Sequence, residues 1–462
     1  MTSFQTLPLD ERDGGVTVAA TGEHPALVRE PMRRLVRRVA LPAVASNLLM
    51  TVFLAADAFW VGRHLGATAL AAVTASVFWV WLGISLAEMV SVGLTALAAR
   101  RHGERRPAEA ARAAGDAVCY AAALGVACAA AGYWGAGGIL ALMGTPPAVA
   151  AVGREYLALY ALSAPVLYAY FSVDAAFRAA GDTRTPFLVL LASVALGLVL
   201  DPVLILGLGG APALGVRGAA LATPLTRGLA CLAGLALLRR RGLVAFGRPR
   251  AATLATITRV GAPTGATGVL FSGVYVVVGR TASLLGTPAL AALGLGFRVE
   301  SWLYMIGVGF GAAAAAVVGQ NMGAGRVDRA ARAGWTMLAV ASAPAVVAAA
   351  LSLLVPATLA GAFTRDAAVV AEASRYLRIV AVSQLVVCAE VVLEGALGGA
   401  GATVAPMVAS TTLTALRIPL AAWAAPRYGA PGLWWVISLT AVGRGVAMMA
   451  LWRGGAWKRK KV

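Results

Sequence analysis

The feature that most constrains this chain is a series of long apolar runs separated by short polar turns. A helix needs about 20 mostly apolar residues to cross the hydrocarbon core of a bilayer. Twelve runs reach that length, so we expect an all-α membrane protein with twelve transmembrane helices. The runs cover approximately residues 35–61, 69–98, 113–134, 152–178, 186–208, 215–238, 260–284, 289–318, 332–355, 367–396, 405–425 and 431–452.

Composition supports the same class. Charged residues make up 13% of the chain, against about 25% in soluble domains. The net charge of +19 could suggest a nucleic-acid partner. However, the positive residues lie in short turns between apolar runs, on one side of the membrane if the spans alternate. We therefore expect a multi-pass protein of the cell membrane with both termini cytoplasmic, in contact with lipid and not with nucleic acid.

The two halves of the chain repeat each other at an offset of 220 residues. LGATALAAV from Leu65 matches LGTPALAAL from Leu285, and AAGDTRTP from Ala179 matches GAGATVAP from Gly399. Each half holds six runs, an even number, so the repeat is parallel, as in secondary transporters that bind substrate between two halves. We expect a disordered cytoplasmic tail (1–32), a first lobe (33–238), a basic linker (239–259), a second lobe (260–452) and a basic tail (453–462).

No motif indicates an enzyme or a bound cofactor. The chain has no GxxxxGK[ST] loop, so ATP does not drive it directly. The three histidines, His24, His64 and His102, lack metal-ligand spacing. The four cysteines form no CxxC pair and fall inside apolar runs, so we expect no metal site and no disulfide. A membrane enzyme would need a catalytic cluster at a membrane face, and the sequence contains none.

Two acids inside apolar runs of the first half are the strongest candidates for chemistry. A charged side chain at the bilayer centre costs about 2.5–3.5 kcal/mol on insertion scales. Asp201 precedes Pro202, which lacks an N–H and so frees a backbone carbonyl one turn earlier. Asp57 lies near the outer end of the first run. The alternative is that packing hydrogen bonds satisfy both acids, although ionisable residues at membrane depth favour function.

The second half has lost both acids. Pairing Val61 with Val278 places Asp57 opposite Val274, and pairing Pro202 with Pro419 places Asp201 opposite Ile418. A purely structural requirement should have kept acids in both copies. Their restriction to one half indicates a site that couples transport to an ion.

The motifs resemble the multidrug and toxic compound extrusion (MATE) family over residues 35–452. They are AADAFWVGRHLGATALAAV (55–73), FRAAGDTRTP with LDPVLILG and GVRGAALAT (177–223), and VGQNMGAGR (318–326). FRVESW and LEGALGGAG look most like its DinF-like, prokaryotic branch. The resemblance implies an antiporter with two six-helix lobes around a V-shaped cleft. Such an antiporter exports amphipathic, often cationic compounds in exchange for H⁺ or Na⁺, and acids at the places of Asp57 and Asp201 form its cation site.

The residues around this site favour protons. Two close carboxylates repel when both ionise, so one becomes a proton acceptor. The family often has an Asn four residues before the second acid, where this chain has Gly197, which offers no oxygen ligand. Na⁺ at Asp57 and Asp201 stays the alternative. Thr223, at the family's GAAxAT position, and Asn47 are further candidates, with backbone or interhelical hydrogen bonding as the other reading.

Other polar residues in the runs could hold a cationic substrate in the cleft. A lobe-stabilising polar network or simple core packing would explain them equally well. The candidates are Glu88, Glu300, Glu390, Glu394, Trp302 and Tyr168.

The alternative function is a flippase or exporter of a lipid-linked or anionic amphiphile. Such a protein should line its cleft with basic residues, and Arg227, Arg298 and Arg417 would serve it. The acids in the runs argue for a cationic substrate instead. We expect a monomer whose partners are small amphipathic molecules.

Overall fold

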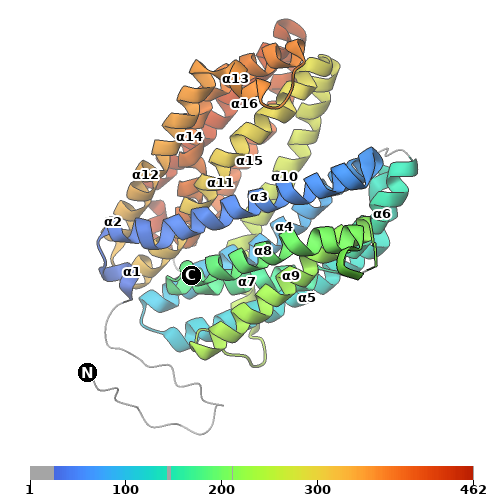
Figure 1. Ribbon diagram of the computed structural model, residues 1–462. Coiled ribbons are helices and arrows are strands. Elements are labelled where there is room, and N and C mark those ends of the chain that lie inside the picture. Colours follow the sequence, from blue (N-terminus) through green and yellow to red (C-terminus); the bar gives the residue numbers. More distant parts are fainter. Residues whose placement is uncertain (1–24, 143–146, 211, 461–462) are drawn as a thin grey trace, which may run out of the picture.

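The protein forms two helical bundles that converge at one end and diverge at the other, like a V (Figure 1). The computed structural model describes residues 25–142, 147–210 and 212–460. The first bundle, blue to green in Figure 1, is the first lobe. The second, yellow to red, is the second lobe. The expected all-α fold with two lobes is confirmed for the part of the chain that the structure describes.

The first lobe contains one broken helix. Helices α6 and α7 meet at an angle of 48°. Ser163 lies at the break and donates its hydroxyl to the Tyr160 carbonyl at 2.5 Å, and Pro165 opens the next helix. The helices of this lobe are α3 (Leu41–His64), α4 (Gly66–Gly103), α5 (Pro107–Leu142), α6 (Pro147–Ala161), α7 (Ala164–Ala180), α8 (Arg184–Leu206) and α9 (Val216–Arg240), with the short 3₁₀ turn η2 (Leu208–Gly210).

The second lobe ends in a helix that doubles back on itself. In α16 the backbone turns at Gly429, with φ 62° and ψ −151°. Arg417 Nη2 donates to the Ile437 carbonyl at 3.3 Å, although twenty residues of straight helix would separate them by about 30 Å. The elements are α10 (Ala251–Leu284), α11 (Thr287–Gly323), α12 (Val327–Leu354), α13 (Pro356–Gly361), α14 (Ala367–Gly399), α15 (Val404–Ala415), α16 (Arg417–Gly454) and η3 (Ala456–Arg459).

The helices account for the expected spans. Ten are long and apolar enough to cross a membrane, or eleven when the bent pair α6 and α7 counts as one. One of these is the stretch Val404–Gly454, which the reversal at Gly429 divides into two. That division gives twelve spans within the described residues.

The lobes touch where glycines let their backbones approach. A Cβ at Gly93 of α4 would lie 2.2 Å from the Ile257 carbonyl oxygen of α10, and one at Gly261 of α10 would lie 1.8 Å from the Met89 oxygen of α4. Gly294, toward the other end of α11, has nothing within 4 Å of such a Cβ. Among these glycines of the described residues, the close approaches between the lobes lie at the converging end, and small residues are common at contacts between membrane helices.

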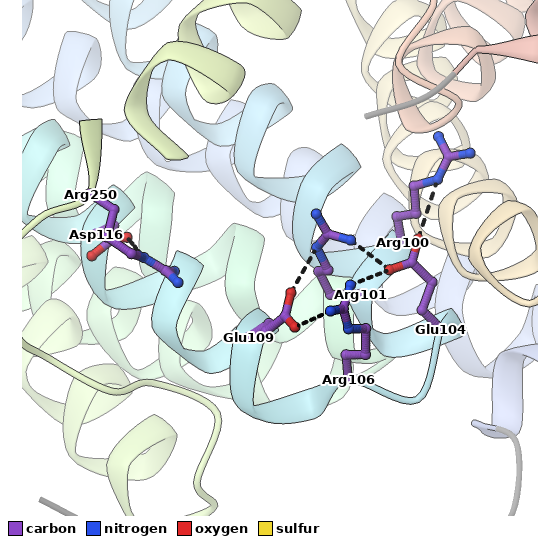
Figure 2. Close-up of polar contacts among 7 residues, drawn as sticks. All are labelled: Arg100, Arg101, Glu104, Arg106, Glu109, Asp116 and Arg250. Atoms are coloured by element: carbon purple, nitrogen blue, oxygen red, sulfur yellow. Dashed lines mark hydrogen bonds and ion pairs between the residues drawn. The ribbon is translucent and has the colours of Figure 1, made fainter. Parts of the chain in front are cut away.

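The converging end also carries the arginine clusters, so we name it the basic end. Figure 2 shows Arg101 and Arg106 bound to Glu104 and Glu109 in the turn between α4 and α5. Arg100 Nη2 reaches the Lys460 carbonyl at 2.9 Å, which ties the first lobe to the C-terminal segment.

The linker between the lobes is anchored at the same end. Arg250 Nε donates to Asp116 of α5 at 3.0 Å, and Asp116 is only 1% exposed (Figure 2). Arg112 donates to the carbonyls of Phe246 and Arg248 at 3.1 and 3.3 Å. The region expected as linker, 239–259, includes the end of α9 and the start of α10.

A short N-terminal segment, residues 25–35, crosses between the lobes, and we name it the strap. It contains α1 (Ala26–Arg29) and α2 (Met32–Leu35) and leads into the π-helix η1 (Val36–Ala40). The Leu27 side chain lies against Gly181 of the first lobe, and its carbonyl accepts from Asn321 of α11 at 3.2 Å. The expectation of a disordered tail over 1–32 is therefore wrong for residues 25–32, because this stretch forms α1 and the start of α2 and buries Leu27 and Val28. Residues 1–24 lie outside the described part.

Candidate functional site

Asp57 and Asp201 lie on adjacent helices, α3 and α8, in the first lobe. Asp201 is fully buried, and neither of its carboxylate oxygens has a hydrogen-bond partner within the described residues. Asp57 is half-buried. The two carboxylates lie within electrostatic range of each other. The fold thus brings together the two acids that the sequence singled out, although 144 residues separate them (201 − 57).

Two tyrosines of α6, Tyr156 and Tyr160, lie beside these acids, and we name the group of Asp57, Asp201 and the two tyrosines the acid pocket. Tyr156 is buried and lies within electrostatic range of both Asp57 and Asp201. Tyr160 stacks on Tyr156, with ring centroids 5.9 Å apart, and senses the charge of Asp57. The sequence analysis missed both. The available signal was their spacing of four, which places two phenols on one face of an apolar helix.

The Phe53 side chain lies one helical turn from the acids, toward the basic end. A Cβ at Gly197, four residues before Asp201, would lie 2.7 Å from the Phe53 ring. Phe53 itself lies four residues before Asp57 and is 3% exposed. The position where the sequence analysis noted the lack of an oxygen ligand is therefore occupied by an aromatic ring.

The other two coupling candidates lie differently. Asn47 Nδ2 donates to the Ala43 carbonyl of its own helix at 3.1 Å. Asn47 lies ten residues before Asp57, about 15 Å along α3, so its part in ion coupling stays a prediction. Thr223 is half-buried on α9, where its carbonyl accepts from Thr226 at 3.1 Å. Within the described residues, no hydrogen bond joins the Thr223 hydroxyl to either acid.

The first lobe also buries an arginine that no carboxylate of the described residues pairs. Arg227 of α9 is 3% exposed and lies between the rings of Phe53 and Tyr170, at 5.7 and 5.6 Å from their centroids. Its Nη2 donates to Met50 Sδ at 2.6 Å, and Nη1 has no partner within the described residues. Aromatic faces, and not an acid, hold this charge.

In the second lobe, the predicted substrate acids gather around an arginine. Glu390 of α14 pairs with Arg444 of α16 at 2.8 Å, and both side chains are buried. Glu394, one turn further along α14, lies within electrostatic range of Glu390 and Arg444, and also of Glu88 from α4. Tyr304 of α11 senses all three acids. Three candidates from two lobes thus form one polar cluster, which we name the central cluster; Tyr304 and Arg444 were missed.

Glu300 belongs to a second group of polar residues in the second lobe, around Arg417. It lies on α11 within electrostatic range of Tyr376, Arg417 and Arg444. Arg417 is fully buried and donates to the Thr440 hydroxyl at 2.7 Å and the Tyr275 hydroxyl at 2.8 Å. Arg417 and Tyr275 are the immediate neighbours of Ile418 and Val274, the residues that stand opposite Asp201 and Asp57 in the repeat.

The two aromatic candidates differ in exposure. Trp302 of α11 is 45% exposed, and it lies two residues from Glu300 and so on another face of the helix. Tyr168 of α7 is 3% exposed and packs in the core of the first lobe, with its hydroxyl against Gly83. In this conformation the side chain is enclosed by its own lobe, and its role as a cleft residue stays a prediction.

Comparison with known proteins agrees with this architecture. The MatE family profile matches the chain twice, over residues 42–203 and 263–423. The two matches begin 221 residues apart (263 − 42) and end 220 apart (423 − 203), which confirms the internal repeat.

Several named proteins are similar over much of their length. The probable multidrug resistance protein NorM of Thermotoga maritima is 28% identical over 93% of this chain and 94% of its own. NorM of Burkholderia mallei is 31% identical over 68% of this chain and 70% of its own. YoeA of Bacillus subtilis is 30% identical over 63% of this chain, and the match spans 64% of that protein.

Solved structures share the fold. An outward-facing multidrug resistance MATE family transporter of the MOP superfamily has a TM-score of 0.88 at 22% identity, over 94% of this chain and 98% of its own. A MOP superfamily transporter from Pyrococcus furiosus, described as having a binding pocket of reverse polarity, has a TM-score of 0.85 at 23% identity, with the same coverage. The repeat, the two-lobe fold and the double family match lead to one conclusion: the chain belongs to the MatE family of multi-pass membrane transporters and is not an enzyme.

Proposed function

We propose that the protein is a secondary antiporter that exports amphipathic, often cationic compounds in exchange for H⁺. The observation that carries the proposal is the acid pocket, in which Asp57 and Asp201 lie together in the interior of one lobe with no ion pair among the described residues. The multidrug names of the relatives support the class of substrate.

Protonation gives this pocket two states. A buried carboxylate without partners is costly when charged and tolerable when neutral. Protons arriving from the open end of the V neutralise Asp57 and Asp201, and the first lobe then favours the arrangement that expels the substrate. The Phe53 ring beside Gly197 leaves the pocket without a side-chain oxygen at that level, which favours H⁺ over Na⁺, since Na⁺ needs several oxygen ligands.

The central cluster supports a cationic substrate. Arg444 neutralises Glu390, and Glu394 and Glu88 then remain to balance a positive charge on a substrate between the lobes. Alternating access follows when the lobes part at the basic end and close at the other. We place the basic end, with both termini, on the cytoplasmic side of the cell membrane, because arginines and lysines gather there, and the protein acts as a monomer.

The test is transport by purified protein in vesicles, with a pH gradient or a Na⁺ gradient imposed separately. A fluorescent cation such as ethidium should be driven by the pH gradient alone. Asp57→Asn and Asp201→Asn should abolish this transport, whereas Ile418→Asn, the matched position in the second lobe, should retain it. Normal proton-driven transport in both aspartate variants would contradict the proposal. Transport driven by the Na⁺ gradient alone would show that the coupling ion is Na⁺ and not H⁺.

One observation favours the alternative, export of an anionic amphiphile. Arg227 is buried in the first lobe, and no carboxylate within the described part of the chain pairs with it. In the same vesicles, an anionic dye offered in place of the cation distinguishes the two substrate classes. Transport of the anion that is lost in Arg227→Met would support the alternative.

A further inference from the structure

The basic end holds a pocket of about 410 Å³ that plays no part in the proposed exchange. One wall is the π-helix η1, which leads into α3, and the other is the turn that joins α7 to α8. The Thr183 hydroxyl faces the carbonyls of Arg38 and Val39 at 3.1 and 2.9 Å, and so pins one wall to the other. The pocket is lined by Arg37, Arg38, Pro42, Gly181, Asp182, Thr183 and Arg184.

Two of the four charges in the pocket are already balanced. The Asp182 carboxylate accepts from Arg241 Nη1 at 2.5 Å and from the backbone amides of Arg184 and Thr185 at 3.0 Å. Arg38 pairs with Glu30 of the strap at 2.5 Å. Burial acts to raise the pKa of Asp182, but bonds from Thr185 and Arg241 outweigh it and hold that pKa below its ordinary value. The carboxylate therefore stays ionised and occupied.

The other two charges are unbalanced. Arg37 and Arg184 are exposed, and neither guanidinium has a hydrogen bond or ion pair within the described residues. They stand on opposite walls, one on η1 and one at the first residue of α8. The pocket therefore presents two free guanidinium groups, and the planar fork of arginine suits the oxygens of a phosphate.

The surroundings of the pocket are apolar on the membrane side. The candidate spans of α3 and α8 run away from it side by side. Large apolar side chains are exposed directly beyond the arginines, namely Leu41 at 52%, Leu188 at 50% and Leu191 at 41%. A ligand that matches both features carries an anionic head and hydrocarbon tails, as anionic lipids do at basic pockets between membrane helices.

We propose that this pocket binds an anionic phospholipid such as phosphatidylglycerol. Its phosphate lies between Arg37 and Arg184, and its acyl chains lie along α3 and α8. The bound lipid links the helix of Asp57 to the helix of Asp201 from outside the acid pocket. The proposal does not depend on which ion drives transport.

The experiment measures protection of the full-length protein against thermal unfolding, followed by tryptophan fluorescence in detergent. Dioctanoyl phosphatidylglycerol, dioctanoyl phosphatidylcholine and inorganic phosphate are titrated separately. Only phosphatidylglycerol should raise the midpoint. In Arg37→Gln/Arg184→Gln its apparent affinity should fall about fivefold for each arginine, hence about 25-fold.

The control removes the same charge elsewhere at the basic end. Arg332→Gln/Arg453→Gln changes two exposed arginines of the second lobe and should bind phosphatidylglycerol as the unmodified protein does. An equal loss in both double variants would mean unspecific attraction and would overturn the proposal, and equal protection by inorganic phosphate would overturn the lipid assignment. If the pocket double variant does not fold, the single variants Arg37→Gln and Arg184→Gln carry the same test, and unchanged affinity in both would overturn it.

Discussion

In the first lobe, Asp201 is buried and neither carboxylate oxygen has a hydrogen-bond partner among the described residues, whereas in the second lobe Glu390 is buried against the guanidinium of Arg444 at 2.8 Å. The arginines differ in the same sense. Arg227 of the first lobe rests on aromatic rings, and Arg417 of the second donates to hydroxyls and a carbonyl. At these positions the first lobe keeps its buried acid and its buried arginine apart, whereas the second lobe pairs its acid with an arginine and bonds its other arginine to hydroxyls and a carbonyl. A lobe with unpaired acids can respond to protons, and a lobe with paired charges can stay rigid.

The sharpest test of this difference is stability after a single acid is neutralised. Glu390→Gln leaves Arg444 buried without its partner and should lower the free energy of unfolding by about 3–5 kcal/mol. Asp201→Asn removes no hydrogen bond, and should change it by less than about 1 kcal/mol. Thermal unfolding in detergent checks both. Equal destabilisation by the two variants would contradict the contrast between the lobes.

The buried arginines give a second comparison of the same kind. Arg417→Met leaves the hydroxyl of Tyr275 and the carbonyl of Ile437 without their hydrogen bonds to Arg417, and should lower the free energy of unfolding by about 2–3 kcal/mol. Arg227→Met loses contacts with two rings but also removes an unpaired buried charge, so the two effects should nearly cancel. The same unfolding measurement applies, and a larger loss for Arg227→Met would show that this arginine has a partner after all.

The central cluster should respond in transport more than in stability. Glu394→Gln removes a negative charge that Arg444 does not neutralise, and should raise the KM for a monovalent cation about tenfold, which corresponds to about 1.4 kcal/mol. The maximal rate should change little. Glu109→Gln, in the turn shown in Figure 2, is the control with the same chemistry. An unchanged KM in Glu394→Gln would place the substrate elsewhere.

The smallest expected effect concerns the turn before α8. Asp182 bonds to the first amides of α8, whereas its counterpart in the second lobe is Ala402. Asp182→Ala should cost about 1 kcal/mol above pH 5, as for the loss of a helix cap. Because the pKa of Asp182 is lower in the folded protein than the unfolded value of about 3.9, this contribution is complete above the unfolded pKa. It disappears as the pH falls through the folded pKa.

Stability profiles from pH 7 to pH 3 measure this contribution directly. The profiles of Asp182→Ala and the unmodified protein should approach each other at the acid end. A difference that persists unchanged at pH 3 would mean that the residue acts through packing and not through its charge.

The fold was predictable because membrane helices are recognised in a sequence by their length and their apolar composition. The repeat was predictable because Gly181 and Gly401 occupy matching turns. Asp57 and Asp201 stood out because acids are rare in apolar runs. Tyr304 and Arg444 did not, since their importance lies in neighbours from other helices, which no spacing along one helix reveals.

Other positions could not be placed from the sequence for a related reason. The sequence does not show that α7 directs Tyr168 into the core of the first lobe. It also does not show that Asn47 bonds to its own helix about 15 Å from Asp57. Residues 25–32 look like a polar tail, yet Leu27 and Val28 are buried, with Leu27 beside Gly181 of the first lobe and its carbonyl bonded to Asn321 of the second. These contacts join distant parts of the chain, so the sequence alone does not show them.

The burial of Leu27 and Val28 in the strap has a consequence for the speed of the transport cycle. Any reorientation that opens the basic end must withdraw these side chains, and each is worth about 1.5–3 kcal/mol when fully buried. The strap therefore stabilises the orientation with the basic end closed, and its residues belong to neither the acid pocket nor the central cluster. Polar residues at these two positions would let the protein dwell longer with its basic end open, and so change turnover while the chemistry of both pockets stays the same.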